Sequence, residues 1–195
     1  CSWNKKFSSK WEKNIGNQYQ SMLVKKAPPK KESSSLPEIE SKFNSGTEIL
    51  YKRAKALLAD GFGKAAVTIQ RAIPNLKKSY EVCVVPENVY KKGHLKGAVF
   101  YNPQDLKSEK ALLSLPSNKI ILVYDLNGHK STFITAYLKM LGYDAKTLKY
   151  GANSFMNSVL SENDSKGFSP KYINNYPTET SEYIEEDGEV EEGGC

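Results

Sequence analysis

The residues best placed to do chemistry form one short loop, made of Asp125, Leu126, Asn127, Gly128, His129 and Lys130. An apolar run at residues 120–124 ends directly before this loop, and a helical pattern begins at Ser131 directly after it. A loop that closes a strand and opens a helix directs its backbone N–H groups inward, at the positive end of the helix dipole. Gly128 permits the tight turn that such a loop needs. The loop is therefore predicted to hold an anion.

The chain supplies that anion itself. We expect the Asp125 carboxylate to accept hydrogen bonds from the loop N–H groups, which would leave the loop structurally intact and chemically silent. Asp125 and Asn127 could also be considered as oxygen ligands for a cation. Ca²⁺ takes six or more oxygen ligands, and these two residues offer too few, so no metal site is predicted. No nucleophile adjoins His129 in the sequence, so we expect it to be a loop donor rather than a catalytic base.

Helix and strand patterns alternate on both sides of the loop. Helices are predicted at residues 47–59, 132–141 and 153–160, and strands at residues 82–85, 99–101, 120–124 and 145–148. The first helix places Ile49, Leu50, Ala54, Leu57 and Leu58 on one face. Residues 65–76 stay ambiguous because Pro74 argues against a long helix there. Continuous apolar strands that alternate with helices predict an α/β fold, with a parallel sheet covered on both faces.

Four segments together resemble the rhodanese-like (sulfurtransferase) family. They are the Gly-His-Leu-x-Gly-Ala segment at residues 93–98, the strand-loop-helix around Asp125, the Leu-Gly-Tyr at 141–143 and the Tyr-Gly at 150–151. The resemblance covers roughly residues 47–162 and implies a parallel sheet with helices on both faces. It also implies a structural role for His94. In active members of the family a cysteine that carries a persulfide stands at the position of Asp125, and a basic residue at the position of Lys130 helps to bind the anionic substrate.

The resemblance therefore implies a degenerate site, since Asp125 cannot take up a sulfane sulfur. Many family members also carry an Asp and an Arg at the positions of Cys83 and Val85, and this chain has lost both. Cys83 stands inside an apolar run and is predicted to be a small buried hydrophobic residue. No catalytic residue is predicted, and the protein is expected not to be an enzyme.

Charge and composition divide the chain into three parts. Residues 1–45 are predicted to be a tether or partner-binding extension, residues 46–165 the rhodanese-like domain, and residues 166–195 an acidic C-terminal tail. The net charge is +6, yet the chain from Glu179 onward carries eight acidic residues and no Lys or Arg, so the positive charge belongs to the rest. The lysines are scattered and no nucleic-acid motif accompanies them, so no nucleic-acid partner is predicted.

The N-terminal stretch, Cys1 followed by Ser2 and a polar segment, resembles a mature bacterial lipoprotein. In that class the sulfur of the first cysteine receives a diacylglycerol, which implies a covalent lipid on Cys1 and a membrane anchor. An arbitrary boundary of the sequence is the alternative. The aromatic residues at positions 3, 7, 11 and 19 would be anchors on a partner, or would have no role in a free tether, and both options stay open. No apolar run approaches the roughly 18 residues that span a bilayer.

The predicted function is a non-catalytic rhodanese-like lipoprotein that serves as a binding or structural subunit of a bacterial envelope complex. We expect it to be anchored in the outer membrane, to face the periplasm, to order its extensions on envelope protein partners, and to use no cofactor other than the lipid. The alternative is a sulfurtransferase or sulfur carrier in which Cys195 or Cys83 replaces the missing loop cysteine. Cys195 is the candidate reactive thiol, because two glycines before it would let it reach other groups.

Overall fold

The structure is a computed structural model that describes residues 5–30, 35–39, 42, 45–162, 167–173 and 176. Structural statements below concern these residues. The predictions about Cys1, Cys195 and the acidic stretch from Glu179 onward lie outside the described residues.

A parallel five-stranded sheet organises the domain, with strand order β2-β7-β6-β3-β5. The strands are β2 (Ala66–Val67), β3 (Ser79–Cys83), β5 (Val99–Phe100), β6 (Ile120–Tyr124) and β7 (Ala145–Leu148). The central strand β6 is paired on both sides, which places Val82 opposite Val123 and Val123 opposite Thr147. The predicted α/β class and parallel sheet are confirmed.

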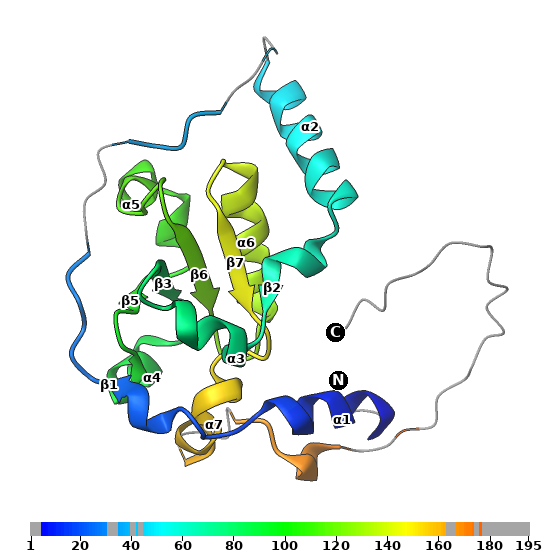
Figure 1. Cartoon of the computed structure of the whole chain (residues 1–195), viewed down its shortest axis with the longest axis vertical. Coiled ribbons are helices and arrows are strands. Elements are labelled where there is room, and N and C mark those ends of the chain that lie inside the picture. Colours follow the sequence, from blue (N-terminus) through cyan, green and yellow to red (C-terminus); the bar gives the residue numbers. More distant parts are fainter. Residues whose placement is uncertain are drawn as a thin grey trace, which may run out of the picture.

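Helices cover both faces of the sheet (Figure 1). One apolar layer joins the sheet to α3, α4 and α7, and the other joins it to α5 and α6. The helices are α1 (Lys5–Asn14), α2 (Gly46–Ala59), α3 (Ile69–Ala72), α4 (Glu87–Lys92), α5 (Glu109–Leu113), α6 (His129–Met140) and α7 (Asn153–Glu162). Short 3-10 helices are η1 (Gln20–Met22), η2 (Phe62–Ala65), η3 (Ile73–Asn75), η4 (Asp105–Lys107) and η5 (Pro170–Tyr172). Among the residues described, no helix combines the length and apolar character needed to cross a lipid bilayer.

Alternation along the strands explains why both faces are apolar. In β3 and just beyond it, Val82 and Val84 point into the layer under α5 and α6, whereas Cys83 and Val85 point into the layer under α3, α4 and α7. Successive strand side chains point to opposite faces, so a strand buried on both faces reads as a continuous apolar run. This is why the residues of β6 were recognisable in the sequence.

Helix α2 confirms the predicted element but not its predicted apolar face. Ser45 caps the helix by accepting a hydrogen bond from the Glu48 N–H at 3.2 Å. Arg53 donates to the carbonyls that end α6, at 2.8 Å from the Lys139 oxygen. Leu50 and Leu58, which the pattern placed on one apolar face, are 49% and 80% exposed. The helix lies at one edge of the domain (Figure 1), so α6 covers only one side of its apolar stripe.

The N-terminal segment docks on the domain itself, an option that the sequence patterns did not suggest. Strand β1 (Leu23–Val24) pairs antiparallel with β4 (His94–Leu95), and α1 lies beside α7 (Figure 1). Gly16 donates its N–H to the Asn153 carbonyl at 3.0 Å. Trp11 is 8% exposed, and its ring meets Tyr150 edge to face at 5.0 Å and stacks on Phe168 at 5.4 Å. Trp11 therefore packs on the chain's own domain, which is neither of the two options that the sequence left open.

Replacing Trp11 with alanine is expected to lower the free energy of unfolding by about 3 kcal/mol, since it removes a large buried ring at a packed contact. Tyr51→Ala is the matched control, because Tyr51 is an aromatic residue that is 69% exposed. Its cost should stay within about 0.5 kcal/mol. Urea unfolding of both variants gives the comparison, and equal costs would show that α1 contributes no stability to the domain.

Candidate functional site

The loop between β6 and α6 wraps around one buried carboxylate. Asp125 is 5% exposed and directly follows β6. Its Oδ1 accepts hydrogen bonds from the Gly128 N–H at 2.6 Å and from the Ser131 hydroxyl at 3.0 Å, and its Oδ2 accepts one from the Lys130 N–H at 3.0 Å. The hydrogen bonds predicted for the Asp125 carboxylate are thus present. It stands at the positive end of α6, where a negative charge is stabilised by the helix dipole.

Gly128 makes the loop geometry possible. Its φ of +96° lies in the region that favours glycine, and a Cβ added there would lie 3.3 Å from the Tyr150 nitrogen and 3.4 Å from the Leu148 oxygen. The first turn of α6 is held by side chains as well. Ser131 shares a hydrogen bond with Thr147 of β7 at 2.7 Å, which connects the loop to the neighbouring strand. Sequence reasoning missed both of these residues as parts of the site, although a serine in the first turn of a helix is a usable signal.

A second segment, residues 150–153, is hydrogen-bonded to the loop and packs against it. The Ala152 N–H donates to the Asp125 carbonyl at 2.8 Å, and Asn153 donates to the Leu126 carbonyl through its backbone N–H at 3.2 Å and its side chain at 2.7 Å. Gly151 lies between these contacts and the end of β7, with a φ of +52°. The Tyr-Gly pair of the sequence analysis therefore packs its backbone directly against the loop. Its role was not evident from spacing alone.

The remaining loop side chains point to different surroundings. Asn127 uses its Oδ1 to accept the His129 N–H at 3.1 Å. His129 contributes this backbone donor, while its ring and the Lys130 side chain are exposed. Leu126 is half-buried and packs against the layer beneath α7. The Asp125 and Asn127 oxygens accept hydrogen bonds from the loop N–H groups. The anion that the loop binds is therefore the Asp125 carboxylate of the same chain. Within the described part of the chain, no group of three His, Cys, Asp or Glu side chains could hold a metal ion.

Cys83 is not placed as a substitute nucleophile. It lies in β3 with no exposed surface, and burial raises the pKa of its thiol to about 12. Only the thiolate reacts as a nucleophile, and a thiol with this pKa stays protonated at neutral pH. Cys83 is a small buried group inside an apolar strand, as its apolar run predicted, and its burial does not favour the alternative in which it carries sulfur. Cys195, the other candidate thiol, lies outside the described residues.

His94 is a packing residue of the layer beneath α4. It is fully buried, its ring stacks on Tyr90 with the centroids 3.8 Å apart, and its Nδ1 lies 2.9 Å from the Tyr90 carbonyl. Its Nε2 has no hydrogen-bond partner among the described residues. The next residue, Leu95, donates its N–H to the Tyr124 hydroxyl at 3.3 Å, which joins β4 to the central strand. These contacts agree with the structural role that the resemblance implied for His94.

Glu81 is a second buried acid, on β3 and remote from the loop in sequence. It is 3% exposed and accepts a hydrogen bond from the Ser79 hydroxyl at 2.7 Å. Burial raises the pKa of the Glu81 carboxyl from 4.5 to about 7, against smaller effects of the Ser79 hydrogen bond and the charge of Lys119. Below about pH 7 the neutral form is therefore favoured in the folded state.

This shift predicts a pH dependence of stability. Between pH 4.5 and 7 the unfolded chain loses the Glu81 proton and the folded chain keeps it, so the stability that this group contributes falls as pH rises through that window. Glu81→Gln is expected to match the wild type near pH 4.5 and to exceed it at pH 8 by about 3 kcal/mol. Urea unfolding at the two pH values checks this, and a pH-independent difference would contradict the raised pKa.

Comparison with known proteins identifies a family and several solved structures to which part of the chain is similar. The family model of the rhodanese-like domain matches residues 79–158. Similar solved structures include a rhodanese-related protein from Thermoplasma volcanium, with 17% identity over 48% of this chain and 91% of the other, at a TM-score of 0.42. A rhodanese-like domain protein from Staphylococcus aureus gives 19% identity over 46% and 89%, at a TM-score of 0.43. Reduced CoADR-RHD from Bacillus anthracis gives 26% identity over 56% and 19%, at a TM-score of 0.44. No curated protein sequence matches the chain.

Proposed function

Because residues 79–158 form a rhodanese-like domain, we propose that this chain is a non-catalytic version of that domain and serves as a binding or structural module. The observation that carries the proposal is the Asp125 carboxylate, which accepts two backbone N–H groups and one hydroxyl of the loop. A loop of this kind acts on sulfur only through a thiolate. Here a carboxylate, which cannot be persulfidated, occupies the position.

Electrostatics support the same conclusion. Thiosulfate is an anion, and the loop donors that would bind it are already used by a buried negative charge. A second anion would have to displace the Asp125 carboxylate or accept its repulsion in a site of low effective dielectric. The exposed Lys130 side chain offers attraction at the surface, but water screens an exposed charge more strongly than a buried one.

The sulfurtransferase reaction provides the test. In the active reaction a thiolate attacks the sulfane sulfur of thiosulfate and releases sulfite, and cyanide then removes that sulfur as thiocyanate. We expect the full chain to form no thiocyanate above the rate without protein. Asp125→Cys is expected to form thiocyanate, because the Gly128 and Lys130 N–H groups would then stabilise a thiolate. Asp125→Ser is the matched control, since it has the size of cysteine and no thiol.

Two outcomes would overturn the proposal. The first is turnover by the wild type at the rate of Asp125→Cys. The second is turnover that persists in Asp125→Ser and disappears in Cys195→Ser, together with a persulfide on Cys195 in the mass spectrum. That result would establish the alternative in which Cys195 is the sulfur carrier.

Exposed apolar side chains on α2 and α6 support the binding role. Leu58 is 80% exposed, Phe133 78% and Tyr51 69%, on two helices that contact each other. Exposed apolar side chains on adjoining elements are typical of recognition surfaces. We propose that the partner is a protein of the bacterial envelope, that a lipid on Cys1 anchors the chain at the outer membrane, and that the chain faces the periplasm.

Mild detergent extraction from the native membrane, followed by mass spectrometry, tests the proposed partner and the proposed lipid. It should find a stoichiometric partner that Phe133→Ser loses and a lipid mass on Cys1; an unlipidated protein that elutes alone would contradict it.

A further inference from the structure

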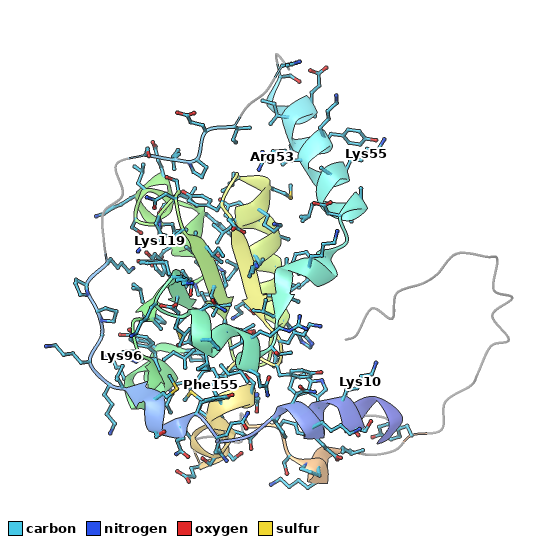
Figure 2. All side chains as sticks on the ribbon, in the orientation of Figure 1. Lys10, Arg53, Lys55, Lys96, Lys119 and Phe155 are labelled. Atoms are coloured by element: carbon cyan, nitrogen blue, oxygen red, sulfur yellow. The ribbon has the colours of Figure 1, made fainter. Side chains whose placement is uncertain are left out.

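A cavity of about 270 Å³ opens on the α3 side of the sheet, away from the loop. Its wall includes Ser79 and Ile120, the first residues of β3 and β6, whereas the loop follows the last residue of β6. Figure 2 marks this separation, with Lys119 just before β6 at one end of the sheet and Phe155 of α7 near the other. The cavity is therefore independent of the loop and of the function proposed for it.

Three positive charges surround this cavity. Arg71 comes from α3, Lys78 from the turn before β3, and Lys146 from β7. Within the described part of the chain no carboxylate forms an ion pair with any of the three, and no Asp or Glu is among the residues that line the cavity. Like charges gathered from three elements repel one another in the empty state, so an anion that enters the cavity relieves that repulsion.

Neutral polar groups complete one side of the wall. Asn75 lies between Arg71 and Lys78 in the chain and donates its side-chain N–H to the Arg71 carbonyl at 3.0 Å. Ser79 gives its hydroxyl to the buried Glu81 at 2.7 Å. Because the hydroxyl hydrogen is already donated, Ser79 does not also donate it to a phosphate oxygen. Burial raises the pKa of Glu81 to about 7, so this acid offsets the positive charge only in part near neutral pH.

The other residues that line the cavity are apolar. They are Val67 of β2, Ala72 of α3, and Ile120 and Leu122 of β6. Ile120 is 37% exposed although its strand is otherwise buried, so its side chain leaves apolar surface uncovered. Burial of such surface by a ligand is favourable at roughly 25 cal/mol per Å². The cavity thus combines charged with apolar lining residues, as pockets for small molecules do.

We propose that this cavity binds a small phosphorylated organic molecule, with the phosphate held by Arg71, Lys78 and Lys146 and the apolar part on Ile120 and Leu122. A phosphate monoester carries close to two negative charges at neutral pH and three acceptor oxygens, which matches three cationic donors better than a carboxylate does. A guanidinium can donate two parallel hydrogen bonds to phosphate. The volume is slightly below the 300 Å³ or so at which typical ligand pockets begin, so the ligand is small.

Isothermal titration of the full chain with phenyl phosphate tests the proposal, with inorganic phosphate and benzoate as reference probes. Phenyl phosphate has both the charge and the apolar part, whereas each reference lacks one feature. We expect phenyl phosphate to bind with at least about tenfold higher affinity than either reference. Arg71→Ala and Lys146→Ala are each expected to weaken phenyl phosphate about tenfold, because each removes a charge-assisted contact.

Lys110→Ala is the matched control, since it removes one exposed positive charge from α5, outside the cavity. An equal loss of affinity in Lys110→Ala and Arg71→Ala would overturn the proposal, because it would mean that only the net charge attracts the probe. Benzoate affinity equal to that of phenyl phosphate would overturn the assignment of phosphate. Ile120→Asp keeps the cations and puts a negative charge on the apolar part of the lining, and unchanged phenyl phosphate binding in that variant would exclude the cavity as the site. None of these variants touches the loop, so a failure here leaves the proposed function unaffected.

Discussion

Gly151→Ala is expected to lower the free energy of unfolding by about 3–5 kcal/mol, the largest effect of any single substitution considered for this protein. A Cβ at this position would lie 2.5 Å from the Asp125 carbonyl oxygen, 2.7 Å from the Asn127 nitrogen and 2.7 Å from the Leu126 carbonyl carbon. All three are backbone atoms of the loop, so no side-chain rotation can relieve the contact. The φ of +52° adds strain for any residue with a Cβ.

Two other glycines separate the contributions to this loss. Gly61 has a φ of +71° with open space around its Cβ position, so Gly61→Ala should show the backbone strain alone, about 1 kcal/mol. Gly63 also has open space and no such φ, so Gly63→Ala should change stability by less than about 1 kcal/mol in either direction. Urea unfolding of the three variants gives the comparison. If Gly151→Ala cost no more than Gly61→Ala, the segment after β7 would not be packed against the loop.

Asp125→Ala is expected to lower the free energy of unfolding by about 3 kcal/mol. It removes the acceptor of the Gly128 and Lys130 N–H groups, and a buried donor without a partner costs about 1–3 kcal/mol. Ser131 loses less, because its hydroxyl keeps contacts with Thr147 and the Gly128 carbonyl. Asp144→Ala is the control, since Asp144 is exposed, and it should stay within about 0.5 kcal/mol.

An added anion provides a second readout for the same site. Formate is the carboxylate that Asp125→Ala removes, and it is small enough to enter the space left by that side chain. We expect formate to raise the melting temperature of Asp125→Ala and to leave the wild type unchanged at equal ionic strength, since only the variant has free loop donors. Equal responses of the two proteins would contradict the conclusion that the Asp125 carboxylate is the resident anion of the loop.

The central part of the fold could be predicted because its signals are local. Strand β6 is buried on both faces over most of its length, so its residues form a continuous apolar run whose limits at Ile120 and Tyr124 are visible in the sequence. Gly142, which has a φ of +99°, directly follows the C-cap residue of α6, as predicted. The helix itself begins at His129, two residues before Ser131, where the helical pattern of the sequence begins, because Asp125 and Asn127 accept hydrogen bonds from its first N–H groups.

The edges of the domain carried weaker signals. Strand β2 has only two residues, too few for any periodicity, and it is held by pairing with β7. Helix α1 lies in a polar segment that composition alone assigned to a tether. Its one large buried ring, Trp11, contacts Tyr150 and Phe168, which are more than one hundred residues away in the chain. Packing between residues so far apart in the chain leaves no pattern in the sequence next to Trp11, because hydrophobic burial depends on the area covered and not on sequence spacing.

The sequence by itself determined the parallel sheet, the loop after β6 and the anion that occupies it. The Asp125 hydrogen bonds join groups within six residues, so strand, loop and helix order sufficed to predict them. Only the tertiary structure decided that Gly151 closes against the loop and that Arg71, Lys78 and Lys146 meet around one cavity. Those groups come from separate elements, and their distances follow from how the helices pack on the sheet, which depends on the shape of the whole core.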